Sequence, residues 1–287
     1  MDQGRPRPLL AYENREFLNS HAGRGLRILA EYQEPLARFR REGIQDTVVF
    51  FGSARCCIRA TAEQALAALD RPEAATAPDY EDALRQAREA LRMADYYDDA
   101  RRLAFMVTRW ARSIPSRRHR FVVTTGGGPG IMEAANRGAH EAGGKTIGLN
   151  VSLPREQRSN PFITPALNFQ FHYFFMRKLW FAYLAKALIV FPGGFGTCDE
   201  LFEILTLAQT EKLAKRIIVV MYGREYWDRV VDFGAMVDAG VIGAADLALF
   251  QMASTPEEAF ELLRAGLVQH HLGPTRRKAP EIAKTRP

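Results

Sequence analysis

The chain has 287 residues, of which 47% are hydrophobic and 25% charged, as is typical of a globular protein with one large α/β domain or two small ones. No apolar run approaches the ~20 residues of a membrane-spanning helix, and the first residues lack the apolar segment of a secretory signal. The three cysteines form neither a CxxC pair nor a zinc-like spacing with histidine. These features predict a cytoplasmic protein that binds no metal and does not associate with membranes.

The net charge of +6 is located at the two ends of the chain. Residues 1–45 have a net charge of +2 and residues 270–287 one of +4, so the segment 46–269 is neutral. A neutral folded segment argues against binding to the phosphate backbone of a nucleic acid. The composition of 270–287 predicts a basic, disordered tail.

The predicted elements begin with an N-terminal arm and an amphipathic helix over 24–42, which together form the segment 1–45. A helical region follows over 60–112, interrupted by Pro72 and Pro78, and is predicted as an insertion into the main domain, 46–269. Strands are predicted near 47–55, 120–125, 145–151, 167–173, 187–191, 216–223 and 247–254. Helices are predicted after the glycines of 126–144, over 174–186, from the end of the turn at 192–197 to about 214, around 226–230, and over 255–271.

Apolar strands that alternate with helices predict a doubly wound, Rossmann-like α/β fold with a parallel sheet and helices on both faces. In such sheets ligands bind beyond the carboxyl ends of the strands. Both glycine-rich turns of the sequence follow predicted strands, so both are expected at that edge.

The first turn, TTGGGPGIME, contains Gly126, Gly127, Gly128 and Gly130. Glycines at a strand-to-helix junction let backbone N–H groups approach a phosphate, although they also serve tight strand–helix packing. The spacing is not GxGxxG, and the next strand ends in GLNV with no acidic residue to bind a ribose. A nicotinamide cofactor is therefore disfavoured.

The second turn, FPGGFGTCDE, runs from Phe191 to Glu200 and contains Gly193, Gly194, Gly196 and Thr197. We expect these glycines to precede a helix with Asp199 and Glu200 in its first turn. Alone, an acidic residue there is an ordinary partner of the helix dipole. Beside a turn of unpaired N–H groups, Glu200 would instead face the molecule that carries the bound anion.

Basic and hydroxyl side chains lie near these turns. Arg177 and Lys178 stand among aromatic residues at the start of a predicted helix, where an arginine forms either an ion pair at the rim of the core or a ligand contact. Ser53 and Arg55 follow the first strand at the same carboxyl edge of the sheet.

Taken together, these motifs resemble the LOG family, the cytokinin riboside 5′-monophosphate phosphoribohydrolases. The family signature PGGxGTxxE is matched by Pro192, Gly193, Gly194, Gly196, Thr197 and Glu200, and the glycine-rich motif is read as GGGPGIM, ending at Met132. The family's Arg-Lys pair corresponds to Arg177 and Lys178. The resemblance spans roughly 46–225, and the helices outside the core of the family indicate a longer, bacterial-type form.

The resemblance implies hydrolysis of the N-glycosidic bond of a nucleoside 5′-monophosphate, such as AMP, without a cofactor. It assigns Glu200 and Arg177 as the catalytic pair. It assigns as substrate-binding residues Ser53, Arg55, Gly127, Gly128, Gly130, Met132, Lys178, Gly193, Gly194, Gly196 and Thr197. The alternative is a nucleotide or molybdenum-cofactor carrier of the same fold that binds without turnover.

Members of the resembled family are dimers or higher homo-oligomers, which implies a homodimer with the site near the contact. The apolar segments 179–185 and 201–209, including Leu205, are candidates for that contact. They could instead be buried beneath the N-terminal helices of the same chain.

Overall fold

The computed structural model describes residues 8–71, 79–152, 158–213 and 215–272. Within these ranges no helix is both long and apolar enough to cross a bilayer. The predicted basic tail falls almost entirely outside the described residues.

A seven-stranded, all-parallel sheet forms the centre of the molecule, in the order β4-β3-β2-β1-β5-β6-β7. This confirms the predicted fold class. The strands are β1 (Thr47–Phe51), β2 (Val122–Thr125), β3 (Thr146–Val151), β4 (Asn168–Phe171), β5 (Ala185–Val190), β6 (Ile218–Tyr222) and β7 (Phe250–Ala253). Residues of β1 alternate between the two faces of the sheet, and both faces are apolar because helices cover both.

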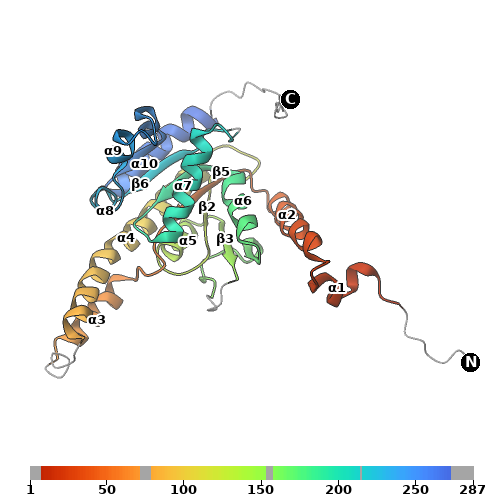
Figure 1. Ribbon diagram of the computed structural model, residues 1–287, viewed down its shortest axis with the longest axis horizontal. Coiled ribbons are helices and arrows are strands. Elements are labelled where there is room, and N and C mark those ends of the chain that lie inside the picture. The colour runs from red at the N-terminus through yellow and green to blue at the C-terminus, as the bar shows by residue number, and fades with distance from the viewer. Residues whose placement is uncertain (1–7, 72–78, 153–157, 214, 273–287) are drawn as a thin grey trace, which may run out of the picture.

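Helices cover the sheet on both sides (Figure 1). The helices are α1 (Arg15–Asn19), α2 (Arg24–Arg41), α3 (Arg59–Leu69), α4 (Tyr80–Ser113), α5 (Ile131–Glu141), α6 (Phe174–Leu184), α7 (Phe195–Gln209), α8 (Arg224–Val230), α9 (Phe233–Asp238) and α10 (Pro256–Leu267). One face packs against α4, α5 and α10. The other packs against α6, α7 and α8, with α2 at its margin.

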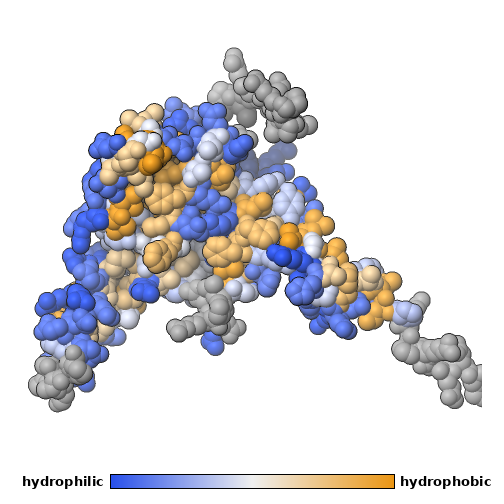
Figure 2. Space-filling model, viewed as in Figure 1, coloured by the Kyte–Doolittle hydropathy of each residue, from blue (hydrophilic) through white to orange (hydrophobic). Residues whose placement is uncertain are grey.

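Two helical segments extend away from this body (Figure 1). The pair α3 and α4 projects at one side, while the C-terminal half of α4 lies in the core, where Leu103 and Ala104 are fully buried. The arm formed by α1 and α2 projects at the other side, and apolar side chains gather along it and over α6 (Figure 2). Leu26 and Leu29 on this arm are about half exposed.

Two predicted boundaries are wrong. The helix α6 ends at Leu184, because Ala185 already pairs with Thr47 of β1 as the first residue of β5. The helix α7 begins at Phe195, with Gly194 as its N-cap, so Glu200 lies in the second turn and not in the first. The other strands and helices named above lie within a few residues of their predicted positions, and α9 was not predicted.

The strand order reverses at β1, which has β2 on one side and β5 on the other. At such a switch point the connections leave in opposite directions and open a crevice at the carboxyl ends of the strands. Both glycine-rich turns follow strands that flank β1.

Candidate functional site

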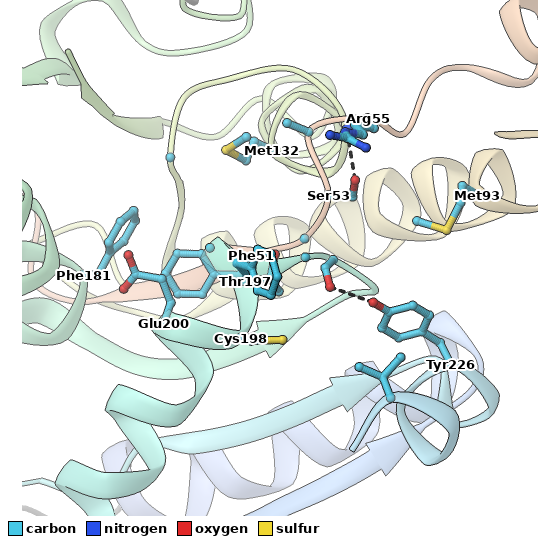
Figure 3. A pocket seen from close by; sticks show the side chains of 18 of the residues that line it. Phe51, Ser53, Arg55, Met93, Met132, Phe181, Thr197, Cys198, Glu200 and Tyr226 are labelled. Atoms are coloured by element: carbon cyan, nitrogen blue, oxygen red, sulfur yellow. Dashed lines mark hydrogen bonds between the residues drawn. The ribbon is translucent and has the colours of Figure 1, made fainter. Parts of the chain in front are cut away.

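A cavity of about 690 Å³ lies at the carboxyl ends of β1, β2, β5 and β6 (Figure 3). In the close-up view Glu200 and Phe181 lie at one end, and Met93 and Tyr226 at the other. Most of the cavity wall is apolar, with a few polar groups that converge on it. This composition is typical of small-molecule sites.

The turn after β5 presents backbone N–H groups to this cavity. Cys198 donates the first hydrogen bond of α7, to the carbonyl of Gly194. Among the described residues the N–H groups of 194–197 have no acceptor. A Cβ atom added at Gly194 or Gly196 would meet no atom within 4 Å. The turn is therefore an open cradle of donors at a helix N-terminus, which attracts anions.

Gly193 has a different role from its neighbours. A Cβ atom there would lie 2.1 Å from the hydroxyl oxygen of Thr197, and its carbonyl accepts a hydrogen bond of 2.7 Å from the hydroxyl of Tyr226. Only glycine lets the turn fold back onto Thr197, so Gly193 shapes the cradle and Gly194 and Gly196 leave it open.

Glu200 is the buried carboxylate of the site. The residue is 4% exposed, and one of its carboxylate oxygens has no hydrogen-bond partner among the described residues. Burial raises the pKa of Glu200 to about 7, although the positive charges of Arg177 and Lys178 act to lower it. A carboxyl with such a pKa changes its charge in the physiological range, as a catalytic acid or base requires.

Arg177 approaches Glu200 from α6, with 3.6 Å between its Nη2 and Oε1 of the carboxylate. Its guanidinium lies over the rings of Phe174 and Phe181, at 4.5 and 5.6 Å from their centroids. Its Nε has no acceptor among the described residues, and burial lowers its pKa from the ordinary value. Both members of the pair thus shift toward their neutral forms, so burial outweighs their mutual attraction.

Ser53 connects the two glycine-rich turns through its backbone. Its N–H donates to the carbonyl of Pro192 at 2.9 Å, and its carbonyl accepts from the N–H of Ile131 at 3.1 Å. A Cβ atom at Gly130, whose φ is +71°, would lie 2.3 Å from that carbonyl oxygen. The loop after β1 is therefore held between the second turn and the start of α5.

The structure brings most of the predicted site residues together. The cavity is lined by Ser53, Arg55, Met132, Arg177, Gly193, Gly194, Gly196, Thr197 and Glu200. Four predicted residues do not line it, namely Gly127, Gly128, Gly130 and Lys178.

These four residues support the site from outside. Lys178 bonds to Asp199 at 2.8 Å and to Glu203 at 3.0 Å, which joins α6 to α7. Gly127 packs so closely on β3 that a Cβ atom there would lie 2.3 Å from the side-chain oxygen of Asn150. The glycines of the first turn could serve phosphate binding or tight packing. The contact of Gly127 is one of tight packing.

Sequence reasoning missed several residues of the cavity. Phe181 could have been found, because it lies four residues after Arg177 on the same face of a helix. Tyr226 follows the strand next to β5, at the same edge of the sheet. Met93 comes from the distant helix α4, and no local pattern marks it.

The chain is similar to a family model, to curated proteins and to solved structures. A family model described as "Possible lysine decarboxylase" matches residues 132–263. Two relatives from Oryza sativa subsp. japonica are named probable cytokinin riboside 5′-monophosphate phosphoribohydrolases, LOGL5 and LOGL2. The first is 31% identical over 39% of this chain and 45% of its own length, and the second 27% identical over 52% and 61%. The chain thus spans about half the length of the curated relatives it matches.

Among solved structures, the molybdenum cofactor carrier protein of Chlamydomonas reinhardtii is 19% identical, with a TM-score of 0.42 over 78% of this chain and 99% of that one. The similarity to named proteins comes instead from the family model and the two relatives from Oryza sativa. Over these parts of the chain it is similar to the LOG proteins, the cytokinin riboside 5′-monophosphate phosphoribohydrolases.

Proposed function

We propose that this chain hydrolyses the N-glycosidic bond of a nucleoside 5′-monophosphate to a free base and ribose 5-phosphate. One observation carries the proposal. A buried carboxylate and a largely buried guanidinium line a cavity beside an open cradle of N–H groups, and each has one atom without a partner among the residues that the structure describes. Such atoms are costly to leave unpaired unless a ligand completes them.

In this proposal each part of the cavity binds one part of the nucleotide. The N–H groups at 194–197 bind the 5′-phosphate, with the positive end of the α7 dipole behind them. The ribose then lies near Glu200, one turn further along α7. The base then lies at the same end of the cavity, which Phe181 and Arg177 line.

The reaction breaks the bond between C1′ of the ribose and the base nitrogen. The bonding electrons leave with the base, and the sugar passes through a cation-like transition state that the Glu200 carboxylate stabilises. Glu200 accepts a proton from the attacking water, whose oxygen bonds to C1′, and the departing base takes up one proton. Arg177 orients the nucleotide and stabilises negative charge on the departing base.

Decarboxylation of lysine, the activity in the description of the family model, fits this cavity poorly. Lysine decarboxylation commonly uses pyridoxal phosphate, which is bound to the protein as a Schiff base with a lysine. No lysine is among the described residues that line the cavity, and Lys178 is paired with Asp199 and Glu203.

We also propose that the chain forms a homodimer through α6. Phe175, Leu179 and Tyr183 recur every four residues on one side of this helix and are 50%, 40% and 46% exposed. A stripe of this kind is suited to a second copy of the helix. Leu205 is only 9% exposed, so a charge at Leu205 would disturb the core of the chain itself.

The experiment that tests the reaction is incubation with AMP, GMP, CMP, UMP and IMP, followed by chromatography of the free bases. Release of a base from at least one of them, with adenine expected from AMP, supports the proposal. Tight binding of a nucleotide without release of its base would favour the carrier alternative and contradict the proposal.

A further inference from the structure

Glu31 of the N-terminal helix α2 makes three hydrogen bonds to α6, the helix that carries Arg177, and to the residues just before it. One carboxylate oxygen of Glu31 accepts a hydrogen bond of 2.7 Å from the N–H of His172, and the other accepts one of 3.2 Å from the N–H of Tyr173. The backbone carbonyl of Glu31 accepts a third, of 2.9 Å, from Nε1 of Trp180. Glu31 therefore holds α6 at its start and again about two turns further along.

The carboxylate of Glu31 accepts hydrogen bonds from the N–H groups of the two residues that precede α6. The N-cap residue, Tyr173, supplies no capping bond from its own side chain. A carboxylate at this position satisfies free N–H groups and interacts favourably with the helix dipole. The surrounding contacts reinforce the joint, because Arg27 donates to the hydroxyl of Tyr173 and Tyr32 stacks on Trp180.

Arg177 lies between these two attachment points. Its N–H donates to the carbonyl of Tyr173 at 3.3 Å, in the first turn of α6. No hydrogen bond joins its guanidinium to Glu200 across their 3.6 Å separation. The placement of the guanidinium therefore depends on the register of α6 and on the rings of Phe174 and Phe181.

We propose that Glu31 is a positioning residue, which fixes the register of α6 and thereby holds the Arg177 guanidinium beside Glu200. Its effect on catalysis rests on the proposed function, whereas its effect on the Arg177–Glu200 pair does not. The helix α2 lies outside the segment 132–263 that the family model matches. The N-terminal helix thus supports the site from outside the matched segment.

The test uses the charge of Glu200 as a sensor of the position of Arg177. The groups that act on Glu200 are Arg177 and Lys178 from α6 and Asp199 and Glu203 from α7. If α6 shifts, the carboxylate loses positive charge, which raises its pKa, or gains contact with water, which lowers it, so the titration midpoint moves. Carbon-13 NMR titration of the ligand-free protein measures this pKa, and the signal is assigned by its loss in Glu200→Gln.

In Glu31→Ala we expect the titration midpoint of Glu200 to move by about half a unit or more, since a nearby opposite charge commonly accounts for ~1–3 units. Glu31→Gln, which keeps one acceptor oxygen, should give a smaller shift of the same sign, and it carries the test if Glu31→Ala does not fold. The matched control is Glu34→Gln, on the same helix, because Glu34 pairs with Arg38 within that helix and with no residue of α6 among those that the structure describes. Glu34→Gln should leave the midpoint unchanged.

The kinetic arm measures kcat for base release, which we expect to fall about tenfold in Glu31→Ala, since small misplacements of catalytic groups cost up to ~10²-fold. A variant with a lowered Tm but an unchanged midpoint and kcat would show that Glu31 only stabilises the fold, and would overturn the proposal. If the wild-type protein releases no base, the reaction has failed, and the NMR titration still decides the role of Glu31.

Discussion

At the scale of single residues, burial and charge compete at Glu200. Desolvation favours its neutral form, while Arg177 and Lys178 favour the carboxylate. Burial prevails, and the pKa of about 7 leaves the side chain able to gain or lose a proton near neutrality. The structure thus gives Glu200 a property that its position in PGGxGTxxE could not reveal.

Glu200→Gln should lower kcat for base release by ~10²–10⁴-fold, because the amide can neither accept a proton nor balance a cationic sugar. Circular dichroism should show an unchanged fold, since the two side chains have nearly the same shape. Quenched assays of base release measure the effect. A rate within threefold of wild type would remove Glu200 from the mechanism.

The pH dependence of kcat/KM should follow the ionisation of Glu200 in the free enzyme. We expect kcat/KM to rise about tenfold per pH unit below the pKa of about 7 and to level off above it, because the carboxylate is the active form. A profile that instead falls through neutrality would indicate that the protonated acid is the active form.

The same pKa has a consequence for stability. The folded state binds the Glu200 proton more tightly than the unfolded state, whose pKa is near 4.5, so this group destabilises the fold as the pH rises from 4.5 to about 7. Glu200→Gln should therefore be more stable than wild type at pH 8 by on the order of 1–3 kcal/mol, and the gain should be absent at pH 4. Urea unfolding at the two pH values measures the difference.

Gly196 offers a test of the phosphate cradle. A Cβ atom there meets no atom of the protein, and alanine is ~1 kcal/mol better than glycine within a helix. Gly196→Ala should therefore fold at least as stably as wild type. It should lower kcat/KM for AMP by about tenfold or more, because the methyl group enters the space proposed for the phosphate.

Adenosine is the matching substrate control. Without a phosphate it gains nothing from the cradle, so wild type should cleave it far more slowly than AMP. Equal values of kcat/KM for AMP and adenosine would show that the turn at 193–197 does not bind the phosphate.

Much of the site could be predicted from the sequence, and the reason is local. The glycines and Thr197 form one contiguous turn, and strand-to-helix order places that turn at the carboxyl edge. Gly127 and Lys178 also belong to contiguous motifs, which predict substrate binding. In the structure Gly127 packs on Asn150 and Lys178 pairs with α7, and these contacts between distant segments leave no pattern in the sequence. Met93 and Glu31 act through contacts distant in sequence, which no pattern encodes.

At the scale of elements, the start of β1 is tied to the start of β2 by a buried carboxylate. Asp46 is 1% exposed, accepts a hydrogen bond of 2.6 Å from the N–H of Phe121, and pairs with Arg120 at 2.7 Å. Phe121 has a φ of +52°, an uncommon conformation for a residue other than glycine. The hydrogen bond to Asp46 thus stabilises an unfavourable backbone conformation of Phe121 at the amino ends of the strands.

Asp46→Ala should lower the free energy of unfolding by about 3–5 kcal/mol, because it leaves Arg120 largely buried without its carboxylate. Denaturant titration measures the loss. A cost below about 1 kcal/mol, the value typical of an exposed pair, would contradict this account of the sheet edge.

The strands and helices could be predicted from the sequence, because apolar strand segments alternate with helical segments along the chain. The glycines of the turn predict that α7 begins after Thr197, whereas Phe195 and Gly196 already have helical geometry. Glycine is usually disfavoured within a helix. In α7 it occurs in the first turn, where the absence of a side chain leaves the N–H groups open.

At the scale of the whole molecule, the proposed dimer depends on the apolar stripe of α6. Leu179→Glu places a charge at the middle of that stripe and should yield a folded monomer, as measured by analytical ultracentrifugation. The control is Val241→Glu, at an exposed position outside α6. A Leu179→Glu protein that stays dimeric would show that the contact lies elsewhere, and a monomeric wild type would contradict the dimer itself.

We propose above all that the cavity lined by the second glycine-rich turn hydrolyses a nucleoside monophosphate. The measurement that tests it most directly is the simultaneous quantification of adenine and ribose 5-phosphate from AMP, for wild type and for Glu200→Gln. We expect the two products in equal amounts from wild type and neither above background from the variant. Intact AMP after prolonged incubation with folded wild-type protein, together with intact nucleotide across the other monophosphates, would contradict it.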